Sequence, residues 1–404
     1  MVDAPHPDAV LKDYKGLEVW EWREDGVLKL ELTGHGVLED YQTDALAGEK
    51  IEVDHYALVV GGDCDVYKPR TNDLLSMFNA EDSVEDRLLI SFRKNVIPKD
   101  LCKMAAENLR KAASKGDNRG MAAGKVDQEK LRTIAKEGEI VLDGKGVRAR
   151  YRQPDGTLST TTAANRVMSG IAGNFDATPR HPFCRQTGYS RSNPGPMREV
   201  IPFLEAVSNR FKVQAPYRWQ LQKNFVDDTG IFPHGWCLGD TVFTTITVNK
   251  NWRTAVHKDA GDFPGGYGNL TVIEGDPYTG GFTGFPKYRL AVDVRTGDFL
   301  AMDVHEWHGN TKMDPVNQPP EGEEWSDPDG ENPGFERISV VCYARFNMRE
   351  CGPLSEEKLK YDAWIAKFLS PKKVQALQLQ QRQDEQDLIN EEIAYLQHLF
   401  EEEL

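Results

Sequence analysis

The stretch VHKDAGD, residues 256–262, places an imidazole and a carboxylate two positions apart, at His257 and Asp259. The segment DVHEWHGN, residues 303–310, follows it and holds His308, 49 residues after Asp259. Side chains at positions i and i+2 of a strand share a face, so His257 and Asp259 can grip one ion together. A third ligand from a later strand leaves other coordination positions open, as in the facial triads of non-haem Fe(II) oxygenases. The pattern predicts metal ligands at His257, Asp259 and His308.

The distal ligand has a competitor, because His305 lies in the same segment as His308. His308 precedes Gly309 and Asn310, as distal ligands often do, and we favour it. His305 is otherwise a buried or supporting histidine.

An arginine follows the second histidine. Arg337 begins the run RISVVCYARF, residues 337–346. A planar guanidinium can hold a carboxylate through two parallel hydrogen bonds. We therefore expect Arg337 to anchor an acidic cosubstrate.

Short β-branched runs surround these motifs and are separated by the turn signals PGGYG, TGGFTG and RTGD. Such evenly spaced strands indicate a sandwich or barrel rather than a parallel α/β sheet. We expect an α+β protein built on a double-stranded β-helix, the two-sheet relative of the jelly roll with an open mouth. The runs are TVFTTITV (241–248), NLTVIE (269–274), YRLAVDV (288–294), DFLAMDV (298–304) and RISVVCYARF.

The remaining pattern predicts three parts. We expect residues 1–88 to form a small β-rich accessory region, residues 89–350 the domain that carries the ligand motifs, and residues 351–404 C-terminal helices. Within the middle part we expect helices over 101–116, 127–139 and 199–212, a loop-dominated stretch over 140–195, a β-helix core over 241–347 and a surface insertion over 313–334. The last helix has an apolar stripe that packs on its own domain or forms a dimer. Its residues are Val374, Leu377, Leu388, Ile389, Ile393 and Leu396.

The net charge of −15 argues against a nucleic-acid partner, since phosphate binding needs a positive surface. The average conceals a pattern. Residues 1–90 carry 8 basic and 21 acidic side chains, whereas residues 91–152 carry 16 basic and 8 acidic ones. The excess positive charge in the middle permits a local phosphate-binding face, or is simply a solvated helical surface.

The six cysteines are scattered, without a CxxC pair. This usage fits a reduced compartment, and it leads us to expect a buried thiol at Cys184. The sequence shows neither an apolar run of the roughly 20 residues that cross a bilayer nor a secretory start. We expect an intracellular protein, in a nucleus or, if viral, in a host cytoplasm, with no membrane partner.

At these motifs the sequence resembles the TET/JBP family of Fe(II)/2-oxoglutarate dioxygenases, which oxidise the methyl group of 5-methylcytosine or thymine in DNA. The resemblance covers roughly residues 90–350, and the segments upstream of the core resemble those of algal, fungal and phage members. It is carried by RGMAAG (119–124), IAGNF (171–175), PFCRQTGYS (182–190), TTITVNKNWRTAVHKDAGD (244–262), GGF (280–282), GDFLAMDVHEWHGN (297–310) and RISVVCYARFN (337–347).

The resemblance implies Fe(II) on His257, Asp259 and His308, with O2 and 2-oxoglutarate as cosubstrates. Arg337 would pair with the distal carboxylate of 2-oxoglutarate, with help from Ser339. An algal branch uses ascorbate instead, and the retained Arg337 and Ser339 favour 2-oxoglutarate.

The resemblance also implies the base contacts. Asp262 stands where several members have a base-contacting Asn or Asp, and a carboxylate can accept from the N4 amino group of cytosine, which thymine lacks. This favours 5-methylcytosine, although Asp262 can also be a loop-capping residue. Arg345 stands where several members have a base-contacting His, and we include Asn251 among the expected substrate contacts.

The methyl group of a stacked base cannot reach such a site, so we expect base flipping onto an aromatic side chain. Candidates for stacking are Trp252, Phe263, Tyr267 and Phe285, and candidates for phosphate binding are Arg119, Lys125, Arg185 and Arg191. The alternatives are a thymine hydroxylase, a prolyl or small-molecule hydroxylase, and a non-catalytic reader of modified bases.

Overall fold

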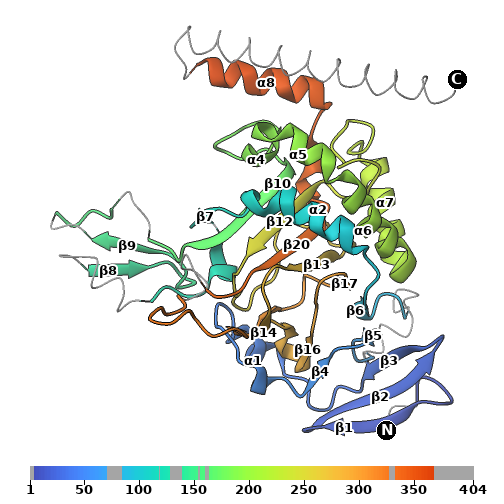
Figure 1. The fold of residues 1–404 in the computed structure, drawn as a ribbon. Coiled ribbons are helices and arrows are strands. Elements are labelled where there is room, and N and C mark those ends of the chain that lie inside the picture. The colour runs from blue at the N-terminus through green and yellow to red at the C-terminus, as the bar shows by residue number, and fades with distance from the viewer. Residues whose placement is uncertain are drawn as a thin grey trace, which may run out of the picture. The chain divides into compact units, whose positions relative to one another are not determined.

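Strand β20 (Arg337–Tyr343) lies inside the largest sheet of the protein, with β13 (Gly268–Glu274) on one side and β12 (Thr245–Lys250) on the other (Figure 1). The structure is a computed structural model. It describes residues 4–70, 84–117, 119–127, 139–152, 155–159, 163–326 and 333–367.

The described residues fall into two compact units, one of residues 1–175 and 186–350 and the other of residues 176–185 and 351–404. In the first unit the large sheet has the order β1-β2-β3-β5-β6-β17-β13-β20-β12-β10, with β7 beside β10. The further bounds are β1 (Val10–Tyr14), β2 (Leu17–Glu24), β3 (Val27–Leu32), β5 (Cys64–Tyr67), β6 (Leu88–Arg93), β7 (Lys115–Gly116), β10 (Val167–Phe175) and β17 (Phe299–Met302).

A second sheet of four strands has the order β18-β15-β16-β4. Its strands are β18 (Gly309–Asn310), β15 (Thr283–Phe285), β16 (Leu290–Val292) and β4 (Leu58–Val60). Two hairpin-like pairs stand apart from these sheets, β14 (Tyr278–Gly280) with β19 (Met313–Pro315) and β8 (Glu139–Leu142) with β9 (Ala149–Arg152). The two-residue strand β11 (Arg185–Gln186) precedes α4.

The period of two along β20 gives the strand two different faces. Ile338, Val340 and Cys342 point into a core shared with helices. The alternate residues Arg337, Ser339, Val341 and Tyr343 line a cavity instead. One strand therefore anchors the helical layer and builds the wall of a site.

Helices cover the Ile338 face of the sheet (Figure 1). Phe203, Val207 and Phe211 lie on one stripe of α6 (Ile201–Gln214) at helical spacing, and all three are fully buried in that core. The other helices are α1 (Asp40–Asp44), α2 (Lys99–Leu109), α4 (Gly188–Ser192), α5 (Pro194–Glu199), α7 (Pro216–Asp228) and α8 (Leu354–Ala366), and the 3-10 turns are η1 (Val53–His55), η2 (Arg110–Ala112), η3 (Gly120–Ala123), η4 (Pro286–Tyr288) and η5 (Phe346–Glu350).

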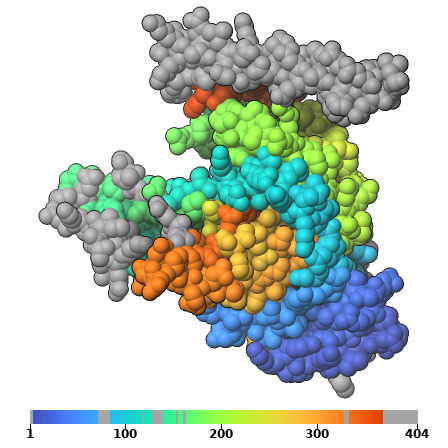
Figure 2. All heavy atoms as spheres, viewed as in Figure 1, coloured from blue at the N-terminus to red at the C-terminus, as the bar shows by residue number. Residues whose placement is uncertain are grey.

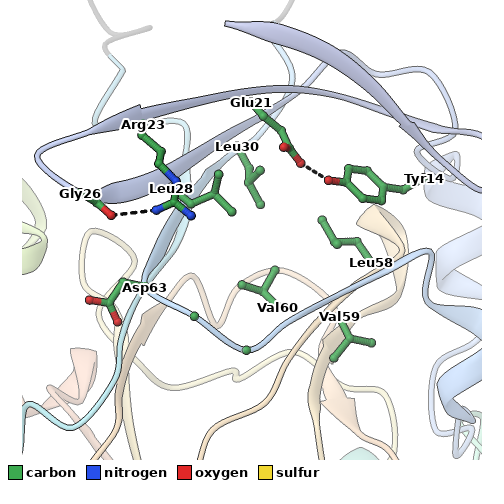
Figure 3. A pocket seen from close by; sticks show the side chains of 12 residues that line it. Tyr14, Glu21, Arg23, Gly26, Leu28, Leu30, Leu58, Val59, Val60 and Asp63 are labelled. Atoms are coloured by element: carbon green, nitrogen blue, oxygen red, sulfur yellow. Dashed lines mark hydrogen bonds between the residues drawn. The ribbon is translucent and has the colours of Figure 1, made fainter. Parts of the chain in front are cut away.

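The N-terminal strands continue the large sheet: β3 pairs with β5 in parallel, and β6 pairs with β17. A cavity of about 460 Å³ lies beneath β1 to β3 (Figure 3). Its charged lining side chains already have partners. Glu21 accepts from the Tyr14 hydroxyl, Arg23 donates to the Gly26 carbonyl, and Asp63 accepts from the backbone of Lys94.

The expectation of a loop-dominated stretch over 140–195 is wrong for Val167–Phe175, which form β10 beside β12. Its glycines looked like turn signals, but here they permit close packing. A Cβ at Gly170 would meet the carbonyl oxygen of Ala112 at 1.7 Å. Gly173 has φ +91° and lies against Thr244.

The expected strands over 241–248, 269–274, 288–294, 298–304 and 337–346 all overlap observed ones, which are β12, β13, β16, β17 and β20. The helices expected over 101–116 and 199–212 correspond to α2 and α6. Helix α7 was missed. The helix expected over 127–139 and the apolar stripe over 374–396 lie outside the described residues, apart from the ends of the first.

The expectation of a free thiol at Cys184 is wrong. Cys184 and Cys351 form a disulfide, with their Cα atoms 5.7 Å apart and their positions separated by 167 in sequence. Sequence spacing cannot reveal so distant a pair, because the fold alone brings the two together. In the same unit, Phe183 packs edge-on against Tyr361 of α8, and the Cys184 backbone donates to Glu357.

None of the helices in the described ranges has the length and apolar character that crossing a membrane requires. The parts proposed over 1–88, 89–350 and 351–404 stay a prediction.

The helical layer should be sensitive to the loss of Phe211, which is fully buried and stacks near Phe243 and Tyr267 with ring centroids 6.4 Å away in each case. We expect Phe211→Ala to lower the free energy of unfolding by about 3–5 kcal/mol, because a large aromatic leaves a cavity that its neighbours fill only in part. Val213→Ala on the same helix is the control, since Val213 is 71% exposed. Equal losses in the two variants, measured by denaturant unfolding, would contradict this packing.

Candidate metal centre

Two separate segments meet at the ligand residues. The backbone N–H of His257 donates to the carbonyl of His308, and the N–H of His308 donates to the carbonyl of His257, both at 2.9 Å. This pair is an isolated bridge rather than part of a regular strand. The Asp259 N–H donates to the Val304 carbonyl at 3.0 Å, which holds the other end of the first segment.

The two imidazole rings are turned by hydrogen bonds at Nδ1. His257 Nδ1 lies 2.8 Å from the Ala255 carbonyl, and His308 Nδ1 lies 3.0 Å from the Glu306 carbonyl. A carbonyl oxygen only accepts, so Nδ1 carries the proton in both rings. Each Nε2 lone pair is therefore available to a metal ion, which is the usual arrangement of metal-binding histidines.

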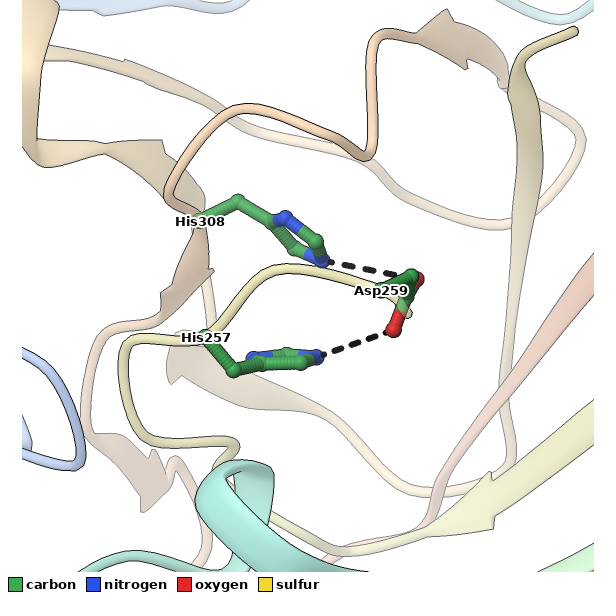
Figure 4. Close-up of side chains that lie close together, drawn as sticks. All are labelled: His257, Asp259 and His308. Atoms are coloured by element: carbon green, nitrogen blue, oxygen red, sulfur yellow. Dashed lines mark ion pairs between the residues drawn. The ribbon is translucent and has the colours of Figure 1, made fainter. Parts of the chain in front are cut away.

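Both Nε2 atoms face the Asp259 carboxylate (Figure 4). His257 Nε2 lies 3.5 Å from Oδ1, and His308 Nε2 lies 3.8 Å from Oδ2. The three ligand atoms lie within 4.8 Å of one another. Two imidazoles and one carboxylate at this spacing can occupy one face of an octahedral ion and leave three positions open.

The electrostatics of the cluster suit a cation. Although burial would raise it, the neighbouring histidines lower the pKa of Asp259 to about 2, so the carboxylate is ionised. Burial, and then the charge of His257, lowers the pKa of His308 to about 4. Burial would also lower the pKa of His257, but Asp259 raises it. A neutral His308 and an ionised Asp259 are the ligand forms that a divalent metal needs.

The structure distinguishes the two candidate distal histidines. His308 completes the cluster with His257 and Asp259. His305 Nε2 lies 3.3 Å from the carbonyl of Phe263, and its backbone N–H donates to Asp303. His305 therefore supports the loop, as the alternative reading had it.

Arg337 lines the cavity and is only 2% exposed. Its Nε donates to the Tyr278 hydroxyl at 3.1 Å, while Nη2 is buried without a hydrogen-bond partner. A buried guanidinium without a counter-charge is unfavourable unless an anion pairs with it. Ser339, two residues along the same face, also lines the cavity. The pair fits a carboxylate ligand.

The cavity measures about 460 Å³ and includes the metal cluster. Asp262 and Arg345 both line it and face each other in a bridge that joins the ligand segment to the end of β20. The Arg345 guanidinium lies 3.8 Å from the ring centroid of Phe175. Burial, and then the charge of Asp259, raises the pKa of Asp262 well above its ordinary value, against the influence of Arg345.

The structure does not bring Asn251 to the cavity. Its φ is +50°, and its side chain is committed to the backbone that enters β20. Asn251 Oδ1 accepts from the Arg337 N–H at 2.7 Å, and Nδ2 donates to the Phe335 carbonyl at 3.1 Å. The structure therefore gives Asn251 a role other than the expected substrate contact: its side chain holds the strand that carries Arg337.

Of the residues expected to stack on a base or bind phosphate, some line the cavity and others are buried elsewhere in the protein. Of the four aromatic candidates only Trp252 is among the cavity residues; Phe263 stacks on Phe225 at 4.2 Å, and Tyr267 and Phe285 are buried in the cores. Arg119 is not a surface contact either. It lines the cavity, its Nε is buried without a partner, and burial lowers its pKa.

The other three cations named for phosphate binding are engaged within the protein. Lys125 pairs with Glu49, Arg185 donates to the Asp176 carbonyl, and Arg191 donates to the Gln186 carbonyl.

Sequence reasoning missed Asn249 and Tyr343, which also line the cavity. A signal was present for Tyr343, because it continues the two-residue period from Arg337 through Ser339. Burial raises its pKa to about 12. Asn249 stands opposite Ser339 in the neighbouring strand, and only the register reveals that pairing.

Residues 171–346 match a protein-family model described as the oxygenase domain of the 2OGFeDO superfamily, Tet_JBP. These residues belong to the TET/JBP oxygenase family. Members of the superfamily use Fe(II), 2-oxoglutarate and O2, and the His257, Asp259 and His308 cluster and the buried Arg337 fit those groups.

Relatives of the TET/JBP domain include two proteins named as thymine dioxygenases. The bifunctional helicase and thymine dioxygenase JBP2 of Trypanosoma brucei brucei is 28% identical over 306 residues, 72% of this chain and 22% of that protein. JBP2 of Leishmania major is 37% identical over 225 residues, 55% of this chain and 18% of that protein. The chain thus spans about a fifth of the length of these relatives.

Among solved structures, NgTET1 in complex with 5mC DNA aligns with 70% of this chain and 78% of its own, at 13% identity and a TM-score of 0.39. At that TM-score the likeness carries no weight for fold or function.

Metal binding by variants of the TET/JBP domain should show whether His308 or His305 is the distal ligand. We expect His308→Ala to abolish tight Co(II) binding, because it removes one of three ligands, and His305→Ala to retain it within a few-fold. Titration followed by visible absorption gives both affinities. Loss of binding in His305→Ala alone would reverse the assignment.

Proposed function

We propose that this chain is an Fe(II)/2-oxoglutarate dioxygenase that hydroxylates the methyl group of 5-methylcytosine in DNA. The observation that carries the proposal is the combination, in one cavity, of a three-ligand metal cluster and a buried guanidinium with an unpartnered Nη2. A metal alone would not require Arg337. A metal together with a dicarboxylate would.

The residues divide the work. His257, Asp259 and His308 hold Fe(II), and Arg337 with Ser339 holds the far carboxylate of 2-oxoglutarate. Bound Fe(II) supplies the redox chemistry in which O2 converts 2-oxoglutarate to succinate and CO2 and hydroxylates a C–H bond. The buried cavity walls orient the two organic substrates and exclude water.

Exposed cations at the cavity support a DNA partner. Lys145 and Arg148, both in the connection between β8 and β9, line the cavity together with Lys258 beside the ligands. Lys145 and Arg148 belong to the basic stretch 91–152, and Lys258 lies between the ligands His257 and Asp259. On an acidic protein, such a local group can hold the phosphates on either side of a flipped nucleotide.

Asp262 supports the choice of base. Its raised pKa favours the protonated carboxyl, which can accept from the N4 amino group of cytosine and donate to N3. Arg345 beside it offers donors to a base oxygen. The cavity residues Trp252 and Tyr343 are the aromatic surfaces available for stacking.

Thymine in DNA is the second candidate, because the JBP relatives are named thymine dioxygenases. A protonated Asp262 could pair with thymine in another orientation. We therefore expect the site to oxidise 5-methylcytosine faster than thymine without excluding thymine.

We also infer that the strands of the large sheet and of the four-stranded sheet that lie within residues 241–347 form the core of a double-stranded β-helix. The cavity supports this, since β20 and β12 of one sheet and β15 and β18 of the other all contribute to its lining. The stretch 313–334 remains a proposed surface insertion, and β19 occupies its beginning.

The substrate can be tested with Fe(II), 2-oxoglutarate and two DNA duplexes that differ only in carrying 5-methylcytosine or cytosine. We expect 5-hydroxymethylcytosine from the first, with one succinate released per product, by nucleoside mass spectrometry. His257→Ala should yield neither.

Asp262→Ala should lower the ratio of 5-methylcytosine to thymine oxidation by about 10-fold, the effect of one lost base contact.

The two duplexes also contain thymine, so its oxidation is measured in the same samples. Equal or faster formation of 5-hydroxymethyluracil would replace the preferred substrate with thymine. Succinate release with a peptide and none with either duplex would move the protein to the prolyl hydroxylases.

A further inference from the structure

The loop that carries the distal ligand is held by a lysine from the N-terminal region, defined here as residues 1–88. Lys68 follows β5 directly. Its Nζ lies 2.9 Å from Asp303 Oδ2 and 3.3 Å from Glu306 Oε1. Both carboxylates belong to the segment between β17 and His308, so one ammonium bridges two points of the ligand loop.

These two carboxylate residues also shape the backbone that leads to His308. Asp303 Oδ1 accepts from the backbone N–H of His305 at 3.0 Å. The Glu306 carbonyl accepts from His308 Nδ1 at 3.0 Å, the hydrogen bond that turns Nε2 toward the metal position. Moving the backbone at Glu306 therefore turns the imidazole of His308.

Without Lys68 the two carboxylates would face each other with little access to water. The Asp303 and Glu306 side chains are 12% and 17% exposed. Burial alone would raise the pKa of Asp303, but the ammonium of Lys68 holds it below its ordinary value. Removing one member of a largely buried charge group leaves the others uncompensated.

Lys68 is itself fixed in place. The backbone N–H of Lys68 donates to the backbone carbonyl of Arg87 at 2.7 Å, and the Arg87 side chain donates from Nη1 to the backbone carbonyl of Lys68 at 3.1 Å. Arg87 in turn pairs with Glu31 of β3. The backbone that carries the Lys68 ammonium is therefore held through Arg87 to strand β3 of the large sheet.

Other N-terminal residues reach the same two ligand segments. The Gly48 N–H donates to the Val256 carbonyl, and the Val256 N–H donates to the Glu49 carbonyl, immediately before His257. Trp307 Nε1 donates to Asp44 at 2.8 Å, immediately before His308. Figure 2 shows the blue N-terminal residues directly against the gold and orange residues of the later strands.

We propose that Lys68 is a positioning residue for His308, and that the N-terminal region is in this way part of the metal centre. The inference rests on the proposed metal site. It gives residues 1–88, which lie outside the matched family residues 171–346, a role in the chemistry.

The test compares the unaltered full chain with four variants by Co(II) titration in the absence of substrates: Lys68→Ala, Lys68→Arg, Lys29→Ala and His257→Ala. Lys68→Ala should weaken Co(II) binding roughly 10-fold, at the lower end of what loss of a supporting contact costs a metal site. Lys68→Arg should retain affinity within about threefold, since its guanidinium can still bridge two carboxylates.

Lys29→Ala is the matched control. Lys29 also bridges two carboxylates in the N-terminal region, at 2.7 Å from Asp65 and 3.7 Å from Glu24, and its side chain is 15% exposed against 23% for Lys68. It does not contact the ligand loop. We expect Lys29→Ala to lower thermal stability about as much as Lys68→Ala while leaving Co(II) affinity unchanged.

The outcomes separate the two claims. If the unaltered protein binds no Co(II), or His257→Ala binds it equally well, the metal site itself fails. If the unaltered protein binds Co(II) through His257 and Lys68→Ala binds it equally tightly, only the role of Lys68 is overturned. Equal weakening in Lys68→Ala and Lys29→Ala would reduce Lys68 to general stability and overturn the proposal as well.

Discussion

Two reciprocal backbone hydrogen bonds between His257 and His308 are the contact on which the rest of the site depends. They join segments about fifty residues apart and set the distance between the two imidazoles. Because each ring is also fixed through Nδ1, little freedom remains at Nε2. The site is therefore preorganised by peptide groups, which no side-chain substitution removes directly.

The large sheet connects this centre to the cosubstrate site. Along β20 every second residue faces the cavity, and the intervening residues pack under α6 and its neighbours. Asn251, at positive φ, binds the backbone at Arg337 and fixes where the strand begins. The packing of β20 against α6 and its neighbours therefore determines where the Arg337 guanidinium lies on the cavity face of the strand.

Much of the site could be predicted from the sequence, because its signals are local. His257 and Asp259 are two residues apart, Arg337 and Ser339 share a strand face, and the five core strands have a β-branched composition. Predictions that needed distant pairing were less successful. Strand β10 was hidden by glycines that serve close packing, and the Cys184 and Cys351 disulfide joins residues 167 positions apart in sequence. Lys68, which follows β5, reaches Glu306, which follows β17, past the single intervening strand β6. Asn251 was misassigned because nothing in the sequence distinguishes a backbone clamp from a base contact.

The central claim is that one cavity holds a metal on three residues and an organic carboxylate on Arg337. Its most direct test is a crystal structure of the protein with Mn(II), as a stand-in for Fe(II), and 2-oxoglutarate under anaerobic conditions, with anomalous scattering to locate the metal. The account predicts one strong anomalous peak bonded to His257 Nε2, an Asp259 oxygen and His308 Nε2, and a carboxylate of 2-oxoglutarate on Arg337 Nη2. A metal bound elsewhere, or 2-oxoglutarate bound away from Arg337, would contradict it.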